Sequence, residues 1–404
     1  MKLSPIITSL LENDLYKFNM QQVILHQFSG YKTTWTFKCR NEDVIFTEEM
    51  VQEIDEQITH YCTLKFTEEE LQYLDSLEWI KGSYVDYLRL WHPRREDIII
   101  SLNNGKLDIE SKGTWLNTTM YEIPILAIVN EVYFKMEYNY NELLESFKEK
   151  LKAKVDALNG LKYRLSNFSE FGLRRRLSGE AQELAIKTLM DVNNHFCKDT
   201  HFVGTSNVYL AKKYNVKPIG TMAHEFIMCV GQGNHKHNPA YSNWYMMDSW
   251  IKEYGILNGI ALTDTITTDC FLKDFQLTFA TLFSGVRHDS GDPVEWGEKM
   301  IEHYLSLGIN PKTKTLLFSD SLNFEKADRL NTRFKYRTNV AFGIGTYLSN
   351  DTKVKPLNIV MKVTKCNGQD VAKLSDADGK QMCKNPEYID YLRRCIDWRL
   401  KNEK

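Results

Sequence analysis

The feature that most constrains this fold is a series of short apolar runs between residues 123 and 342, each followed by small or polar residues. Segments with helical character separate the runs, and this alternation is typical of a parallel sheet covered by helices. The predicted strands are Ile123–Val129, Phe202–Val203, Pro218–Ile219, Gly259–Leu262, Leu282–Val286, Thr315–Phe318 and Asn339–Phe342. Because strand ends meet at one rim of an α/β barrel, we expect the polar residues after these strands to surround one pocket.

The two ends of the chain have a different pattern. Near the N-terminus, alternating or apolar strands are predicted at residues 33–37, 98–100 and 107–109, and Thr67 with Glu70 forms the capping box of a predicted helix. After Pro356, a strand over residues 358–363 and a helix over Pro386–Asn402 are expected to return to this N-terminal layer. Together these elements predict a mixed α+β layer built from both chain ends.

Chain length supports a division into two domains. The chain has 404 residues, which is too long for one small core, whereas an α/β barrel alone takes about 250 residues. We therefore predict an α+β domain over residues 1–122, completed by residues 356–404, and an α/β barrel over residues 123–355.

Composition excludes several classes of partner. The net charge of −2 gives no broad basic surface for nucleic acid or for an anionic membrane. The eight cysteines include no C-x-x-C pair, which argues against a zinc site or a secreted disulfide framework. The sequence has neither a signal peptide pattern nor an apolar run of about 18 residues. We expect a cytoplasmic protein with reduced thiols and without a membrane span.

Three of the polar segments after predicted strands suit anion or metal binding. In Gly343–Thr346, two glycines allow backbone N–H groups to approach a phosphate, and a following helix would direct its positive end to the same anion. Arg287–Asp292 combines an arginine, two acids and a glycine, which suits a carboxylate or phosphate with a divalent cation, although a structural ion pair is the alternative. The acid in Ser319–Ser321 can accept sugar hydroxyls or cap a helix.

The segment Phe168–Arg176 contains three adjacent arginines. Successive helical residues point about 100° apart, so we expect at most one of the three to face a ligand. If the segment is helical, Phe171 and Arg174 share one side and can stack on and neutralise a planar aromatic acid. Tyr16 offers a second aromatic ring near the N-terminus, although amphipathic packing explains it equally well.

A single histidine occupies a junction between elements. His224 lies between the extended run at Pro218–Ile219 and the apolar run Phe226–Val230. Element junctions are where many folds place their reactive groups. A hydrogen-bonded structural histidine is the alternative, and position alone does not decide between the two.

In combination, these segments resemble the nicotinate phosphoribosyltransferase family. The similarity extends from about residue 11 to residue 375 and is carried by Asn13–Lys17, Phe168–Arg176, Gly204–Asn207, Gly220–Phe226, Arg287–Pro293, Ser319–Ser321, Ala341–Thr346 and Ala372–Ser375. The family joins nicotinate to phosphoribosyl pyrophosphate, giving nicotinate mononucleotide and pyrophosphate on the salvage route to NAD, with ATP hydrolysis. The resemblance implies an irregular α/β barrel of the type II phosphoribosyltransferase kind, with an α+β domain from both chain ends.

The resemblance also implies roles for individual residues. His224 matches the histidine that the family phosphorylates from ATP, and Asp289 matches an acid that lies near Mg²⁺, directly or through water. Nicotinate would contact Tyr16, Phe171, Arg174, Ser206 and Arg287. Phosphoribosyl pyrophosphate would contact Arg40, Ser319, Asp320, Gly343, Gly345, Thr346, Lys373 and Ser375. The family pattern allows a homodimer with shared sites, in which Tyr16 reaches across from a second subunit, and it gives no role to His288.

Two related enzymes and two other classes are the alternatives. Nicotinamide-using relatives have an aspartate at the position of Ser206, and a carboxylate there would repel nicotinate. The arginine run and the phosphorylatable His224 argue against a quinolinate enzyme. An aldolase or dehydrogenase barrel would need a Schiff-base lysine or a G-x-G-x-x-G segment at a strand end, and neither is evident. An RNA-binding protein would need a broad basic surface.

Overall fold

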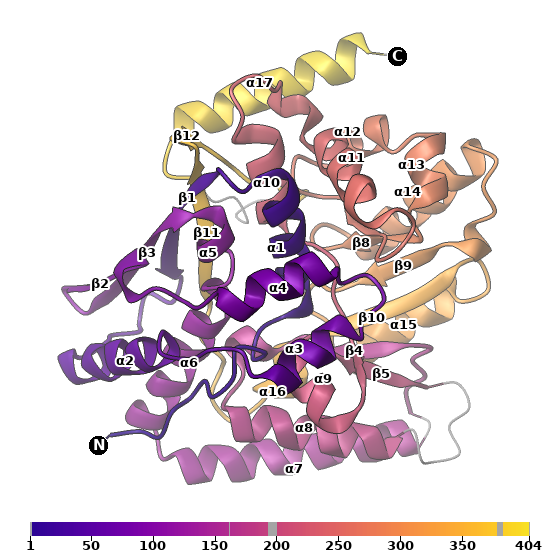
Figure 1. Cartoon of the computed structure of the whole chain (residues 1–404). Coiled ribbons are helices and arrows are strands. Elements are labelled where there is room, and N and C mark those ends of the chain that lie inside the picture. Colours follow the sequence, from indigo (N-terminus) through magenta and orange to yellow (C-terminus); the bar gives the residue numbers. More distant parts are fainter. Residues whose placement is uncertain (1, 161, 193–199, 378–382, 404) are drawn as a thin grey trace.

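The computed structural model describes residues 2–160, 162–192, 200–377 and 383–403. Within these residues the chain forms two sheets, a five-stranded antiparallel sheet and a seven-stranded parallel sheet, with helices around and between them (Figure 1). No helix in this part of the chain has the length and apolar composition of a membrane span. Seven cysteines are unpaired thiols, and Cys197 lies outside the described residues.

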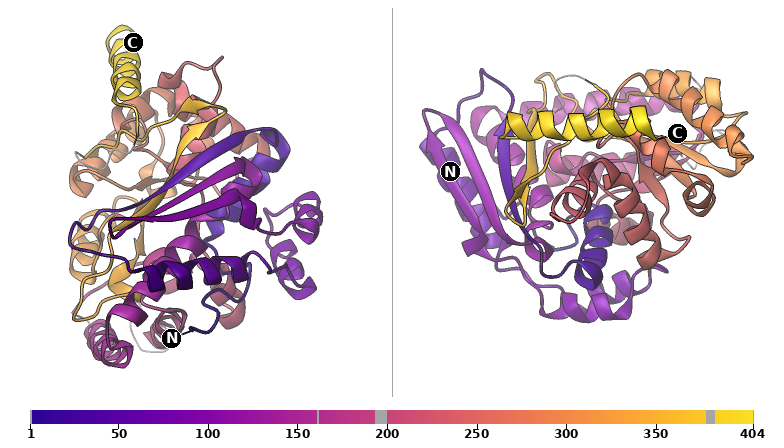
Figure 2. Two further views of the ribbon diagram at one scale, coloured as in Figure 1. Left: turned by 90° about the vertical axis from the view of Figure 1, so that its left-hand side faces the viewer. Right: turned by 90° about the horizontal axis from the view of Figure 1, so that it is seen from above.

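The antiparallel sheet joins both ends of the chain. Its order is β12-β11-β1-β3-β2. The strands are β1 (Lys32–Cys39), β2 (Ile98–Asn103), β3 (Lys106–Thr114), β11 (Ile359–Cys366) and β12 (Gln369–Asp370). Central β1 pairs with β3 on one side and with β11 on the other, where Phe37 lies opposite Met361. The alternation that predicted this strand places Trp35 and Phe37 in the core. Strands from residues 32–39 and 359–366 therefore lie side by side (Figure 2).

The parallel sheet positions the polar strand ends. Its order is β6-β5-β4-β10-β9-β8-β7, and each neighbouring pair is parallel. The strands are β4 (Phe168–Glu170), β5 (Phe202–Thr205), β6 (Lys217–Pro218), β7 (Ile260–Leu262), β8 (Gly285–His288), β9 (Thr315–Phe318) and β10 (Asn339–Ile344). The sheet curves into a half-barrel that has β6 and β7 as its edges. Thr221 Oγ1 donates to Ile260 O across this open side at 3.0 Å, and Asn19 Nδ2 donates to Gly220 O at 2.8 Å. An irregular α/β barrel is therefore confirmed.

Helices cover both sheets. They are α1 (Leu15–Gln27), α2 (Glu48–Tyr61), α3 (Glu68–Asp75), α4 (Gly82–Leu90), α5 (Trp115–Thr118), α6 (Glu122–Glu137), α7 (Tyr140–Asn159), α8 (Gly179–Val192), α9 (Val208–Tyr214), α10 (His224–Gln232), α11 (Ser242–Tyr254), α12 (Thr268–Asp274), α13 (Leu277–Leu282), α14 (Pro293–Ser306), α15 (Phe324–Phe334), α16 (Thr346–Ser349) and α17 (Pro386–Asn402). Short 3₁₀ turns occur at η1 (Arg95–Asp97), η2 (Leu173–Arg175), η3 (Pro239–Tyr241) and η4 (Pro311–Thr313). The capping box of Thr67 and Glu70 is confirmed at the start of α3. Helix α17 lies along the outer surface, where Arg399 Nη2 binds Asp274 Oδ1 at 2.6 Å (Figure 2).

Two strand predictions are wrong. Residues 123–129 belong to helix α6, which is buried on every side, so its apolar residues form a continuous run with no helical periodicity. Leu282 ends helix α13, and β8 begins at Gly285. The segment over residues 168–176 is also not one helix, because β4 is followed by the η2 turn. The predicted boundary at residue 122 falls at the first residue of α6, and the exact domain limits remain predictions.

Candidate active site

The candidate active site lies where β7, β8 and β9 end and α10 begins. His224 is the first residue of α10, after Ala223 in extended conformation. Its Nδ1 lies 2.9 Å from Thr265 Oγ1, and its Nε2 lies 3.0 Å from Asp289 Oδ2 and 2.8 Å from Lys373 Nζ. Burial, together with the charge of Lys373, lowers the pKa of His224 to about 4. The imidazole is therefore neutral at physiological pH, which is the form that accepts a phosphoryl group.

A second carboxylate completes this group, which we call the histidine cluster (His224, Asp264, Asp289 and Lys373). Lys373 Nζ lies 2.9 Å from Asp264 Oδ2 and 3.5 Å from Asp289 Oδ2. Burial opposes ionisation of Asp289, but the hydrogen bond with His224 and the charges of Lys373 and Arg287 hold its pKa well below the usual range. The cluster thus combines two carboxylates, one ammonium and one neutral ring.

The histidine cluster fits a divalent cation. Ligand atoms of His224, Asp264 and Asp289 all lie within 4.8 Å of one another. Asp264 Oδ1 is buried and makes no hydrogen bond, so a strong acceptor is left without a partner in the described structure. Carboxylate oxygens are the ligands that Mg²⁺ prefers in proteins.

Arg287 and Ser319 border the histidine cluster on the β8 and β9 side. Arg287 Nη1 donates to Met222 O at 3.0 Å, Nη2 lies 3.6 Å from Asp289 Oδ1, and the buried Nε makes no hydrogen bond. Ser319 Oγ donates to His288 O at 3.0 Å and to Asp289 Oδ1 at 3.3 Å. Asp320 follows directly and accepts from Ser321 Oγ at 3.1 Å. The predicted segments after β8 and β9 are therefore brought together.

The glycines after β10 lie against Phe171. A Cβ atom on Gly343 would lie 2.3 Å from the Phe171 ring, so packing of that ring excludes any side chain at this position. Gly345 has its nearest contact with Phe171 O at 3.4 Å, and Thr346 begins the four-residue helix α16. An internal contact therefore also requires a glycine at position 343, and the close approach of a phosphate stays a prediction.

The aromatic and cationic residues predicted for nicotinate also converge. Phe171 follows β4 and donates from its N–H to Ile344 O at 2.8 Å, which fixes it beside β10. Burial alone would lower the pKa of Arg174. The neighbouring acidic groups of Tyr16, Glu122, Asp289 and Asp14 have the opposite effect, and the pKa is raised overall. Tyr16 thus lies near Arg174 of its own chain, and its contribution to the site of a second subunit stays a prediction.

Ser206, which follows β5, lies against the start of α1. Its Oγ donates to Asp14 Oδ1 at 2.6 Å, and its backbone O accepts from Leu15 N at 2.9 Å. Asp14 was not predicted as a site residue. Its only signal was its place two residues before Tyr16.

The three arginines have different surroundings. Arg176 is buried and binds Glu12 Oε2 at 2.9 Å, so it is structural. Burial and the charges of Arg174 and Arg40 lower the pKa of Arg175 to about 10, and its Nε makes no hydrogen bond. Arg175 therefore lies near Arg174 and Arg40, whereas Arg176 is bound to Glu12, and the number of arginines that face the ligand stays a prediction.

Lys362 belongs to the same cationic group and was missed from the sequence. Burial, with the charges of Lys373, Arg40 and Arg174, lowers its pKa to about 8. Lys362 lies in β11 between the buried Met361 and Val363, so strand alternation places it on the opposite face. The alternation can be recognised in the sequence. The pairing of β11 with β1, which brings Lys362 near Arg40, cannot.

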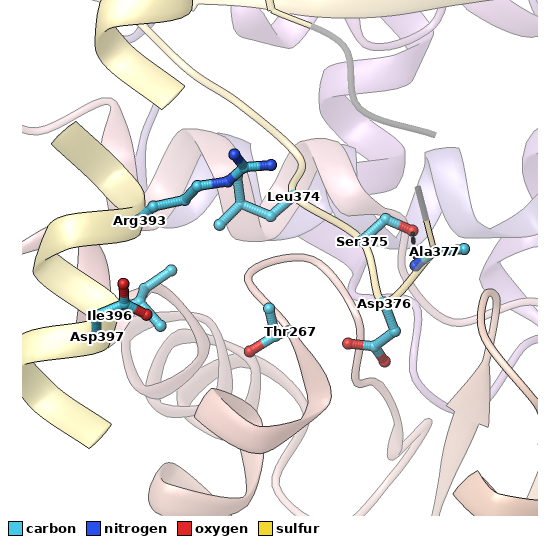
Figure 3. Close-up of a pocket in the computed structure, with 8 residues that line it drawn as sticks. All are labelled: Thr267, Leu374, Ser375, Asp376, Ala377, Arg393, Ile396 and Asp397. Atoms are coloured by element: carbon cyan, nitrogen blue, oxygen red, sulfur yellow. Dashed lines mark hydrogen bonds between the residues drawn. The ribbon is translucent and has the colours of Figure 1, made fainter. Parts of the chain in front are cut away.

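The segment after β12, which holds Lys373 and Ser375, lies against the segment after β7, and each contains one residue with a strained backbone. Ser375 and Thr267 have φ angles of +70° and +77°, which cost about 1–3 kcal/mol each for such residues. Ser375 Oγ donates to Ser290 Oγ at 2.8 Å, and Asp376 Oδ1 accepts from Thr268 N at 2.8 Å. A pocket of about 270 Å³ separates this segment from α17; it is lined by Thr267, Leu374, Ser375, Asp376, Ala377, Arg393, Ile396 and Asp397 (Figure 3).

Asp264 and Thr265 are further residues that the sequence analysis left without a role. Both follow β7, and they contact Lys373 and His224 respectively. They belong to the polar segment after a predicted strand, so the rim argument could have included them.

Comparison with known proteins agrees with this geometry. The chain matches the model of the nicotinate phosphoribosyltransferase (NAPRTase) family over residues 166–399 and that of the NAPRTase N-terminal domain over residues 11–130. It is 44% identical over 393 residues to nicotinate phosphoribosyltransferase of Ralstonia nicotianae, covering 96% of this chain and 98% of that protein. The enzyme of Acinetobacter baylyi is 45% identical over 403 residues, which are 98% of this chain and 97% of its own.

Solved structures give the same result. A crystal structure of nicotinate phosphoribosyltransferase from Vibrio cholerae superposes with a TM-score of 0.88 and 33% identity, covering 98% of this chain and 96% of that one. The Porphyromonas gingivalis structure superposes with a TM-score of 0.86 and 33% identity, covering 97% and 100%. The family matches cover both the half-barrel and the antiparallel sheet. The chain belongs to the nicotinate phosphoribosyltransferase family.

Proposed function

We propose that this protein transfers the 5-phosphoribosyl group of phosphoribosyl pyrophosphate to nicotinate, giving nicotinate mononucleotide and pyrophosphate in NAD salvage, and couples the transfer to ATP hydrolysis through His224. The observation that carries the ATP coupling is the neutral imidazole of His224 within hydrogen-bond distance of Lys373 and Asp289. The cytoplasmic location and a homodimer with shared sites remain predictions from the sequence.

The first step would take place at His224. A ring nitrogen attacks the γ-phosphorus of ATP, the new N–P bond forms as the bond from the γ-phosphorus to the β,γ-bridging oxygen breaks, and ADP leaves. Thr265 would orient the ring through Nδ1, and Lys373 would neutralise the incoming phosphoryl group. Asp264 and Asp289 would hold Mg²⁺, which when bound would neutralise charge on the phosphates.

The second step would be the glycosyl transfer, after which water would attack the phosphorus on His224, break the N–P bond, release inorganic phosphate and restore the ring. The anomeric carbon loses pyrophosphate through an oxocarbenium-like state while the pyridine nitrogen attacks from the opposite face, so no general base is needed. Tyr16 and Phe171 would hold the pyridine ring, and Arg174 and Arg287 would neutralise its carboxylate. The other contacts are proposed as Ser206 for nicotinate, Asp320 and Ser319 for the ribose, Gly343, Gly345 and Thr346 for the 5′-phosphate, and Arg40, Lys362, Lys373 and Ser375 for pyrophosphate.

The proposal is tested by product analysis. The protein is mixed with phosphoribosyl pyrophosphate, Mg²⁺ and ATP, together with nicotinate, nicotinamide or quinolinate in separate reactions. We expect nicotinate mononucleotide and ADP from the nicotinate reaction. Product from nicotinamide or quinolinate, with none from nicotinate, would reverse the substrate assignment. Equal nicotinate turnover without ATP, and no ADP with it, would contradict the coupling.

A further inference from the structure

The hydroxyl proton of Ser206 is already committed to a buried carboxylate. Ser206 Oγ donates to Asp14 Oδ1 at 2.6 Å, and the two side chains belong to residues that are 3% and 5% exposed. Asp14 occupies the N-cap position of α1, where an aspartate usually accepts from its own helix, but its side chain makes no such bond. The Asp14 carboxylate is instead turned toward Ser206.

This hydrogen bond determines what Ser206 can offer to a ligand. A serine hydroxyl has one proton and two lone pairs. While Asp14 is ionised and holds that proton, Ser206 presents only lone pairs, which suit the N–H groups of a carboxamide and oppose a carboxylate. If Asp14 carries a proton, Asp14 donates to Ser206, and the Ser206 hydroxyl is free to donate to a ligand carboxylate. A serine at this position therefore selects an acid only when Asp14 is neutral.

The surroundings of Asp14 make this neutral form accessible. Burial raises the pKa of Asp14 to about 6; the Ser206 hydrogen bond and the positive charges of Arg174 and Lys17 oppose this rise, and Glu122 adds to it. Glu170, on the neighbouring strand β4, is a second buried carboxyl that interacts with Asp14, and burial raises its pKa to about 7, so Asp14→Asn is the variant that assigns the proton to Asp14. Tyr16, on the same helix, is held protonated because burial raises its pKa well above the usual value. A ligand carboxylate placed beside this group adds negative charge and favours protonation of Asp14 further.

We propose that nicotinate binds together with one proton, which Asp14 takes from solvent, and that the Asp14–Ser206 pair thereby selects a carboxylate over a carboxamide. This inference rests on the proposed function. Nicotinate binds the form of the protein in which Asp14 is protonated. Once the pH exceeds the value at which Asp14 of the free protein is half-ionised, nicotinate binding therefore weakens by up to about tenfold per pH unit. Nicotinamide binding should show no such loss.

Calorimetry measures the proton directly. Nicotinate is titrated into the protein at pH 7 with saturating pyrophosphate and Mg²⁺, so that no transfer occurs, in two buffers of different ionisation enthalpy. We expect about one proton taken up per nicotinate bound, and nicotinate affinity about 10–100-fold weaker at pH 8 than at pH 6. Asp14→Asn keeps the shape of the side chain and donates permanently from its amide. It should take up no proton and bind nicotinate with the same affinity, within about threefold, across this range.

The controls separate this inference from the proposed function. Asp86→Asn changes an exposed carboxylate bound to Arg89 and should leave the proton count unchanged. Wild-type protein that binds nicotinate without proton uptake and with the same affinity from pH 6 to pH 8 would overturn the inference while leaving the proposed function intact. The wild-type measurements stand alone if Asp14→Asn fails to fold. Protein that neither binds nor turns over nicotinate would contradict the proposed function and this inference with it.

Discussion

Two ionic clusters meet at neighbouring residues of α10. His224 belongs to the histidine cluster, and Glu225 belongs to a second group, which we call the lysine cluster (Lys17, Glu122 and Glu225). Lys17 Nζ lies 2.7 Å from Glu122 Oε2 and also binds Glu225. Glu225 Oε1 accepts from Thr119 Oγ1 at 2.6 Å and Trp115 Nε1 at 3.1 Å. Both clusters place two carboxylates around one lysine, but each oxygen of Glu225 has a donor, whereas Asp264 Oδ1 in the histidine cluster makes no hydrogen bond.

The difference lies in what each cluster leaves without a partner. In the histidine cluster, Asp264 Oδ1 makes no hydrogen bond, and His224 Nε2 lies between a donor and an acceptor that compete for it. A buried polar group without a partner costs free energy, so such groups persist where a ligand completes them. Full pairing at Glu225 indicates a structural role, and the incomplete pairing of Asp264, in the cluster of the adjacent His224, indicates a chemical one.

The largest effect is expected from Lys17→Met in the lysine cluster. This change leaves two buried carboxylates without the ammonium between them, and breaking such a pair typically costs about 3–5 kcal/mol. Urea unfolding measures the loss of the free energy of unfolding. Lys373→Met is the matched variant in the histidine cluster, where Mg²⁺ should restore most of the lost stability. Equal recovery of the free energy of unfolding in both variants on addition of Mg²⁺ would contradict the proposal that the cation site belongs to the histidine cluster and not to the lysine cluster.

Asp289→Asn should mainly reduce catalysis. The change removes one charged oxygen from the candidate cation site and the acceptor at 3.0 Å from His224 Nε2. We expect kcat/KM for nicotinate in the ATP-coupled reaction to fall about 100-fold, which corresponds to about 2.7 kcal/mol of transition-state stabilisation. The unfolding midpoint should change little. A variant with normal kcat/KM and greatly reduced stability would show that Asp289 stabilises the fold and is not needed for catalysis.

Arg174→Gln should raise the KM for nicotinate. A hydrogen bond to a charged group contributes about 1.5–3 kcal/mol, so we expect KM to increase at least tenfold with a smaller change in kcat. Arg175→Gln is the neighbouring control. Because Arg175 lies near Arg40, which is proposed to hold pyrophosphate, this change should affect the KM for phosphoribosyl pyrophosphate instead. A larger nicotinate effect from Arg175→Gln would exchange the two assignments.

The smallest effect concerns pH. Burial lowers the pKa of His224 to about 4, so a fall in pH from 8 to 6 leaves the imidazole neutral. We therefore expect the rate of histidine phosphorylation at saturating ATP and Mg²⁺ to change by less than about twofold across this range. An ordinary histidine with a pKa of about 6.5 would instead lose most of its neutral form at pH 6. A steep fall in rate toward pH 6 would contradict the effect of burial.

The rim of the barrel was predictable because polar residues after parallel strands share one edge whatever their separation in sequence. Arg287, Asp289, Ser319 and His224 were expected at this edge, and they lie together in the structure. Prediction from the sequence failed for α6, because a helix buried on all sides loses the periodicity that distinguishes it from a strand. It also missed Lys362 and Asp14, whose place in the site depends on the pairing of β11 with β1 and on contact between α1 and β5. Such contacts between distant segments have no local pattern.

Labelling with γ-labelled ATP tests the central claim, that His224 is the phosphate-accepting group of this rim. We expect an acid-labile, base-stable label that maps to His224 and disappears in His224→Ala. His288→Gln is the matched control, because His288 is a second buried imidazole nearby, 2% exposed and with an Nε2 that makes no hydrogen bond. It should retain the label. A label that survives His224→Ala, or that maps to another residue, would contradict the account.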